Sequence, residues 1–279
     1  NKAIRCSCLA FSPLAYFRTE SARMKNLILL ALAALSAPAS AQVLINEVSA
    51  SNVNTITDSF GDNEDWVELF NTTSAAVDLS GWYLSNKVSN PTKWAFPSGA
   101  SIPANGMLLV YCSKRNTVAG SEYHTSFKLD QTDQDHVVLS DPGATIIDDV
   151  ALTPPTKTDN SRGRTTDGAA TWSLFLNPTP GASNAAPSPE YAPRPALTPN
   201  AGFYPGAQSI TMTTPDATCT IRYTTDGSEP TTASTAYTAP INVSATTVIR
   251  AACFSSTSGV PPSFIETNTY FINDNHTTA

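Results

Sequence analysis

The residues best suited to chemistry are concentrated between positions 44 and 86, where acidic and aromatic side chains alternate with short apolar runs. Segment 65–71 reads DWVELFN, and its alternation predicts a strand with Val67 and Leu69 on one face. If that face fills a core, two aromatic rings flank a carboxylate on the other face. The opposite face consists of Trp66, Glu68 and Phe70. Either another part of the chain covers this face, or a ligand binds it.

Two more aromatic residues follow in the same stretch and complete the set of candidate ligand-binding residues. The candidates are Trp66, Glu68, Phe70, Trp82 and Tyr83. Aromatic rings exposed on a sheet can stack on sugar rings, so the chemistry they suggest is glycan binding. Trp and Phe more often fill a core, because they bury large apolar areas, and this alternative stays open.

An acidic loop lies just before the predicted strand. Asp58, Asp62 and Asp65 surround Gly61 at short spacing, and oxygen ligands of this kind can hold Ca²⁺ in an extracellular module. The spacing does not follow the EF-hand pattern, and acidic loops are more often solvated or cap backbone amides. We therefore expect no cofactor, with calcium at these three aspartates as the alternative.

Groups suited to catalysis are few. The histidines are His124, His136 and His276, and none has the HExxH or Cys–His spacing of a zinc site. The GxSxG motif of an activated serine is also absent from the sequence. These observations predict that this chain is not itself an enzyme.

The cysteines divide between the N-terminal segment and the later strands. Cys6 and Cys8 precede the predicted mature protein, and Cys112 lies on an apolar strand as an ordinary buried thiol. Alternation within CTIRYT and TVIRAACF places Cys219 and Cys253 on the inward faces of two strands. Because disulfides persist in oxidising compartments, we predict a Cys219–Cys253 disulfide in an exported protein.

The N-terminal segment has the features of a secretory signal peptide at residues 24–41. A basic start is followed by an apolar run at 27–35 and by the small-residue site Ala39-Ser40-Ala41. The run is too short for a transmembrane anchor, so we expect no membrane insertion after cleavage. Residues 1–23 would be an untranslated or disordered leader. The protein is thus predicted to be secreted, and extracellular or at the cell surface.

Charge argues against nucleic acid as a partner. The formal net charge of the 279-residue chain is −7, and basic residues outnumber acidic ones in the segment that signal cleavage would remove. An acidic protein repels the phosphate backbone and anionic membranes.

The elements that must position these residues are short strands. We predict an all-β protein with two Ig-like β-sandwich domains, because short alternating runs separated by turn residues dominate the sequence. The first domain spans 42–184 and the second spans 200–273. Residues 185–199 are rich in Pro, Ala and Ser and predict an extended linker, and 274–279 would begin a further region.

The first domain resembles the lamin tail domain of secreted bacterial proteins. The matching text is Ile45-Asn46-Glu47-Val48, Gly61-Asp62, Asp65 through Asn71, Asp78 through Ser85, Lys93 through Pro97, Ile102 through Gly106, Gly163-Arg164, Asp167-Gly168, Thr179-Pro180-Gly181 and Asn184. The resemblance implies an Ig-like sandwich.

The second domain is similar to the Ig-like C-terminal domain of chitobiase and β-hexosaminidase. The similarity rests on Gly202-Phe203-Tyr204, Ile221 through Thr231, Tyr237, Pro240-Ile241 and Ile249-Arg250-Ala251. In such enzymes the domain is accessory, so the resemblance implies no catalytic residue here.

Together the two domains resemble the N-terminal part of bacterial proteins that continue into a CotH-type spore-coat kinase-like domain. We expect a binding or adhesion module pair that anchors or presents a larger extracellular or cell-surface protein. Its ligand would be a glycan or a surface protein. The alternative is the accessory region of an extracellular enzyme, either CotH-type kinase-like or a hydrolase, whose catalytic domain follows residue 279. The sequence leaves the oligomeric state open.

Overall fold

The computed structural model describes residues 42–133 and 135–274, and these ranges contain strands and turns but no helix. No part of these ranges forms a helix long and apolar enough to cross a membrane. The predicted leader and signal peptide lie outside the described residues. The described chain is all-β, as predicted.

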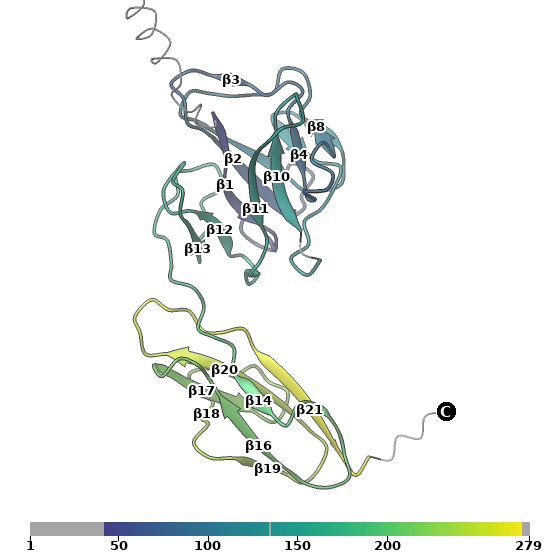
Figure 1. Cartoon of the computed structure of the whole chain (residues 1–279), viewed down its shortest axis with the longest axis vertical. Helices are drawn as coiled ribbons and strands as arrows, with labels where there is room; N and C mark the ends of the chain where they lie inside the picture. Colours follow the sequence, from purple (N-terminus) through teal and green to yellow (C-terminus); the bar gives the residue numbers. More distant parts are fainter. Residues whose placement is uncertain (1–41, 134, 275–279) are drawn as a thin grey trace, which may run out of the picture. The chain divides into compact units, whose positions relative to one another are not determined.

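The first Ig-like domain consists of strands β1 to β13 (Figure 1). The strands are β1 Val43–Ser49, β2 Trp66–Asn71, β3 Val77–Asp78, β4 Tyr83–Ser85, β5 Trp94–Ala95, β6 Ser101–Ile102, β7 Met107–Tyr111, β8 Thr117–Ala119, β9 Glu122–His124, β10 His136–Ser140, β11 Ile146–Ala151, β12 Ser161–Arg164 and β13 Trp172–Phe175. They form a seven-stranded sheet in the order β13-β12-β1-β2-β7-β9-β8, a four-stranded sheet in the order β11-β10-β4-β5, and the pair β3-β6.

The core of this domain lies between its sheets. Val67 and Leu69 of β2 are fully buried there, as the alternation predicts, together with Leu84 and Leu139 of the four-stranded sheet. Strand β1 departs from simple alternation, because its register with β2 shifts between Ile45 and Glu47. This β-bulge lets both Ile45 and Val48 face the core, which a regular strand could not do.

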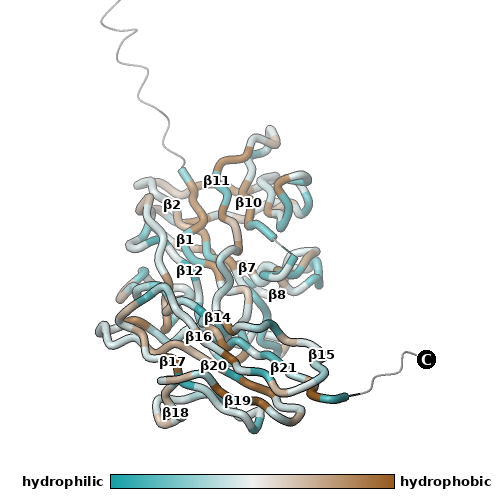
Figure 2. Tube along the Cα trace, turned by 60° about the horizontal axis from the view of Figure 1, so that its bottom comes forward, coloured by the Kyte–Doolittle hydropathy of each residue, from teal (hydrophilic) through white to brown (hydrophobic). Residues whose placement is uncertain are grey.

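The second Ig-like domain consists of strands β14 to β21. The strands are β14 Ala196–Thr198, β15 Gly202–Tyr204, β16 Gln208–Thr213, β17 Cys219–Thr224, β18 Thr235–Ala236, β19 Ile241–Val243, β20 Thr247–Ser255 and β21 Glu266–Ile272. A five-stranded sheet has the order β15-β21-β20-β17-β18, and a three-stranded sheet has the order β14-β16-β19. Hydrophobic residues, coloured brown in Figure 2, lie along β20. The second core includes Ile210, Ile221, Ile249 and Tyr270.

The Pro-rich segment 185–199 is more structured than a free linker. Its last part contains β14, which pairs with β16 and so belongs to the second domain. Its first part contacts the first domain, because Arg162 forms two hydrogen bonds with Glu190 at 2.7 and 2.8 Å. The Tyr191 hydroxyl also donates to Asn160 Oδ1 at 2.6 Å. Composition predicts an extended chain but misses these contacts.

The predicted disulfide is absent from the structure, in which Cys219 and Cys253 are free thiols. Both side chains pack toward the second core, as predicted. However, Cys219 lies opposite Ser255, and Cys253 lies opposite Ile221. The cysteines are therefore diagonal neighbours, and their side chains interact directly, because Cys219 forms a side-chain hydrogen bond with Cys253. The Cys219–Cys253 disulfide stays a prediction.

Candidate functional site

The face of β2 that could bind a ligand is covered by the protein itself. Trp66 and Glu68 have no exposed surface, and Phe70 is half-buried. An alanine Cβ at Gly168 would lie 3.3 Å from the Phe70 ring, so the backbone of the loop after β12 passes close to it. The structure thus corrects the prediction that Trp66, Glu68 and Phe70 form a ligand-binding face, because none of these side chains offers an open surface to a ligand.

Two segments distant in sequence hold the Glu68 carboxylate. Asn46 Nδ2, at the β-bulge, donates to Glu68 Oε1 at 3.0 Å. The backbone N–H of Gly181 donates to Glu68 Oε2 at 2.6 Å. Both carboxylate oxygens thus bind the framework, and the second bond fastens the C-terminal segment of the domain to β2.

Glu47 is a second fully buried carboxylate and fastens the same C-terminal segment. Ser161 donates its hydroxyl to Glu47 Oε1. The Thr179 hydroxyl donates to Glu47 Oε2 at 2.7 Å, and the Thr179 N–H lies 3.1 Å from both oxygens. These hydrogen bonds therefore connect the β-bulge to the segment 179–184, and each part stabilises the position of the other.

Asn46 and Asn184 complete this group, which we call the clasp: Asn46, Glu47, Glu68, Ser161, Asp167, Thr179, Gly181 and Asn184. Asp167 Oδ1 accepts from Asn46 Nδ2 at 3.0 Å and from the N–H of Asn184 at 2.9 Å. Asn184 Nδ2 donates to the backbone carbonyl of Asn46 at 3.2 Å. These hydrogen bonds involve six polar residues of the lamin-tail-like motif: Asn46, Glu47, Glu68, Asp167, Thr179 and Asn184.

Burial changes the proton affinity of the clasp. Desolvation raises the pKa of Glu68 to about 7, although the hydrogen bonds from Asn46 and Gly181 oppose the rise. Burial likewise raises the pKa of Glu47, against the hydrogen bonds from Ser161 and Thr179. A carboxyl with a pKa near 7 suits general acid–base catalysis. A catalytic group must also reach a substrate, and these two carboxylates are fully covered.

The remaining aromatic candidates support the fold. Trp82 is half-buried and packs against the first core. Tyr83 is half-buried on β4, opposite Ala95 of β5 and Ser140 of β10. Neither side chain is an exposed aromatic ring on which a sugar could stack.

Arg115 pairs with three carboxylates of the acidic loop. Arg115 Nη1 lies 3.2 Å from Asp58 Oδ2 and 3.0 Å from Glu64 Oε1, and Nη2 pairs with Asp62. Asp58 Oδ1 also accepts the N–H groups of Phe60 and Asp62, at 2.9 and 3.0 Å. The guanidinium thus occupies the position between carboxylates that a metal ion would need.

The third predicted calcium ligand points elsewhere. Asp65 accepts the N–H of Asn52 at 3.4 Å, and burial raises its pKa to about 6. Within the residues that the structure describes, no group of three or more His, Cys, Asp or Glu side chains could hold a metal ion. Arg115, fifty or more positions along the chain, could not be linked to this loop by sequence pattern alone.

His124 and His136 also have structural surroundings. His124 is fully buried, its Nδ1 lies 3.1 Å from Ser113 Oγ, and its ring stacks on Tyr111 at 5.3 Å. His136 Nδ1 lies 2.7 Å from Asp149 Oδ1. His276 lies outside the described residues.

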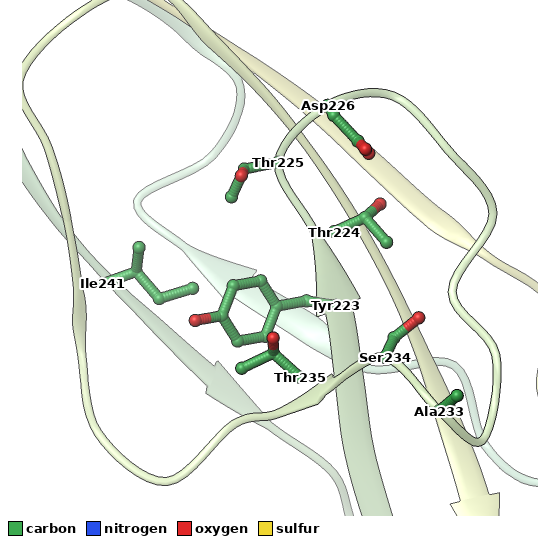
Figure 3. Close-up of a pocket in the computed structure, with 8 residues that line it drawn as sticks. All are labelled: Tyr223, Thr224, Thr225, Asp226, Ala233, Ser234, Thr235 and Ile241. Atoms are coloured by element: carbon green, nitrogen blue, oxygen red, sulfur yellow. The ribbon is translucent and has the colours of Figure 1, made fainter.

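An open depression lies on the second domain, whereas all the ligand-binding residues predicted from the sequence lie in the first domain. It has a volume of about 400 Å³ and is formed by the end of β17, the following loop and β18, with Ile241 beside them. Figure 3 shows the Tyr223 ring in the middle of the lining residues, with Ile241 and Thr235 next to it. The lining residues are Tyr223, Thr224, Thr225, Asp226, Ala233, Ser234, Thr235 and Ile241.

Comparison with protein families identifies both domains. Residues 36–154 match the Lamin Tail Domain, and residues 199–264 match the Chitobiase/beta-hexosaminidase C-terminal domain. The search of curated proteins found no match. Strands β12 and β13 lie beyond the first match, yet they continue its sheet through the pairing of β12 with β1. Both resemblances are confirmed in the predicted order, and the chain contains a lamin tail domain followed by a chitobiase/β-hexosaminidase C-terminal domain.

Proposed function

We propose that the chain is a non-catalytic binding protein that anchors or presents a larger extracellular protein at a surface. Its ligand is a glycan or a surface protein. Both domains belong to Ig-like module families rather than catalytic ones, which supports a binding role.

The observation that carries the proposal is the clasp. Four acidic and amide side chains of the lamin tail motif, those of Asn46, Glu47, Glu68 and Asn184, are buried, and their hydrogen bonds join segments of the same domain. Residues that would serve acid–base chemistry in an open cleft serve the framework here. The clasp thus supports the framework of the first domain, and the open depression of the second domain offers a surface to a ligand.

The predicted signal peptide supports the extracellular setting of the proposal. The predicted signal peptide at 24–41 and the acidic balance of the chain suit a secreted or cell-surface protein. The same balance disfavours nucleic acid and anionic lipid surfaces as ligands.

The experiment is a glycan array combined with a pull-down of surface proteins, both with the purified chain. Mass spectrometry of each captured ligand then records whether it was altered. Saturable binding of an unaltered glycan or protein is expected. Cleavage or modification of the ligand would contradict the non-catalytic role, and absence of capture in both arms would contradict the binding role.

A further inference from the structure

We propose that the depression beside Tyr223 binds one unit of a neutral saccharide. The inference rests on the proposed binding function and narrows the ligand to a glycan. Four side chains would contact the sugar: Tyr223, Thr225, Asp226 and Thr235.

The position of Tyr223 suits the face of a sugar ring. Its strand β17 pairs with β18, where Thr235 lies directly opposite Tyr223, and with β20 on the other side. The tyrosine is half-buried and packs partly against the second core, which fixes the ring. A fixed aromatic ring at the base of a depression can pack against the C–H face of a sugar.

The loop that borders the depression is held in place before any ligand arrives. Asp226 Oδ1 accepts from the N–H and the hydroxyl of Ser228, at 3.0 and 2.6 Å. Gly227 has φ +82°, which a glycine adopts without strain, and its carbonyl accepts from Arg250 Nη1 at 2.9 Å. The Thr224 hydroxyl donates to the carbonyl of Ser228 at 2.6 Å.

The other end of the loop is fixed in the same way. Ser234 Oγ accepts the N–H of Thr231 at 2.9 Å, and the Ser234 carbonyl accepts from Arg222 Nη1 at 2.7 Å. A loop ordered by its own bonds loses little conformational entropy when it binds a ligand.

These bonds leave several polar atoms available to a ligand. The hydroxyls of Tyr223, Thr225 and Thr235 and the Oδ2 atom of Asp226 form no hydrogen bond with any residue in the described ranges. Figure 3 shows the Thr235 side chain next to the Tyr223 ring, with Thr225 and Asp226 toward the other end of the depression. Hydroxyl donors and a carboxylate acceptor in the same depression as an aromatic ring match the hydroxyls and the C–H face of a sugar.

Charge selects a neutral sugar. Two hydrogen bonds from Ser228 lower the pKa of Asp226 and keep its carboxylate ionised; the bond from the hydroxyl has the larger effect, and the bond from the N–H adds to it. Thr225 and Thr235 are uncharged. The cations that contact this loop are Arg222 of β17, which is engaged with Ser234, and Arg250 of β20, which is engaged with Gly227 and Glu229. An anionic sugar would meet an uncompensated carboxylate.

The test is an NMR titration of the ¹⁵N-labelled full chain with methyl glycosides of glucose, galactose and mannose, and with the methyl glycoside of glucuronic acid. We expect shifts centred on Tyr223, Thr225 and Asp226 with at least one neutral glycoside, and weaker binding of the glucuronide.

Three variants and one control test the contacts. The double variant Thr225→Val/Thr235→Val should weaken binding by about tenfold, because it removes two hydrogen bonds. Asp226→Asn keeps the acceptor for Ser228 but removes the charge. It should therefore weaken the binding of neutral sugars and reduce the difference in affinity between them and the glucuronide. Tyr223→Phe keeps the ring and should retain part of the affinity. Thr220→Val, an exposed threonine earlier on β17, should leave binding unchanged.

The outcomes separate this inference from the proposed function. A glycoside could bind while the chemical-shift changes of the protein lie outside the depression, or while the variants bind like the wild type. In either case the depression is not the site, and the glycan-binding function stands. If no glycoside in the panel binds while a surface protein is captured, the saccharide inference is overturned and the binding function stands. Backbone spectra that are unchanged outside the loop show that the variants fold.

Discussion

At the scale of single residues, burial decides what the carboxylates of the lamin tail domain do. Glu68 has a pKa near 7, which is often the mark of a catalytic acid, yet both of its oxygens bind parts of the same domain. An ionised carboxylate in this position lacks the solvation of water, so protonation favours the folded state. The clasp should therefore make the stability of the domain depend on pH.

The expected dependence follows from the raised pKa of Glu68. Between about pH 4.5 and 7 the folded state holds a proton that the unfolded chain releases, so stability falls as pH rises, by at most about 1.4 kcal/mol per pH unit. Asp65, with a pKa of about 6, acts in the same direction at lower pH. Urea unfolding at pH 5, 6, 7 and 8 measures the effect.

Tryptophan fluorescence reports this domain selectively, because all four tryptophans lie in it: Trp66, Trp82, Trp94 and Trp172. Glu68→Gln should flatten the decline in unfolding midpoint between pH 5 and 7. Glu229→Gln, at an exposed glutamate of the second domain, is the matched control and should retain the wild-type slope. Equal slopes in all three proteins would show that Glu68 is not the titrating group.

Arg115 offers a second prediction at the residue scale. Arg115→Met leaves three carboxylates without their shared cation, and two of them, Asp58 and Glu64, are buried. The melting temperature of the first domain should fall, because a buried charge without a partner is unfavourable.

Lys128→Met is the control for the same loop. The Lys128 amine pairs with Glu64 at 2.9 Å, but its side chain is 57% exposed, and exposed ion pairs contribute little to stability. It should therefore lower the melting temperature less than Arg115→Met. The reverse order would contradict the assignment of Arg115 as the central cation of the loop.

At the scale of elements, local pattern and distant partners have separate roles. Alternation correctly placed Val67 and Leu69 in the core, because a strand dictates which side chains share a face. The same pattern could not show what covers Glu68, since its partner Gly181 lies 113 positions away. The β-bulge in β1 and the strand β14 within the Pro-rich segment likewise depend on pairing with distant strands.

The second domain shows the same division. The inward faces of Cys219 and Cys253 were predicted from alternation, whereas their diagonal register was not, because register depends on how two strands meet. The Asp226-Gly227 turn is evident in the sequence, but the depression also requires Ile241, from another part of the chain.

Gly163 gives the element-scale prediction. A Cβ there would lie 3.0 Å from Asn184 Nδ2 and from the Phe175 ring, and 3.1 Å from Glu47 Cγ. Gly163→Ala should therefore destabilise the first domain by about 1–3 kcal/mol, because β12 could no longer pack closely against the clasp.

Scanning calorimetry of the full chain can follow this loss as a lower melting temperature. Gly206→Ala is the control, since nothing lies within 4 Å of the added Cβ. If Gly163→Ala melted like the wild type, the close packing between β12 and the clasp would not contribute to stability.

At the scale of the whole molecule, we expect the two domains to have different roles. The lamin tail domain uses its polar motif to hold its own segments together, and the chitobiase/β-hexosaminidase C-terminal domain keeps a polar depression open. Stability and ligand affinity should therefore respond to different substitutions.

One comparison tests this central claim most directly: glycan affinity and urea unfolding, measured on the wild type, Glu68→Gln and Asp226→Asn at pH 7. We predict that Glu68→Gln changes the unfolding midpoint of the first domain and leaves glycan affinity unchanged, while Asp226→Asn weakens glycan binding and leaves that midpoint unchanged. A loss of glycan affinity in folded Glu68→Gln, with Asp226→Asn binding like the wild type, would contradict it.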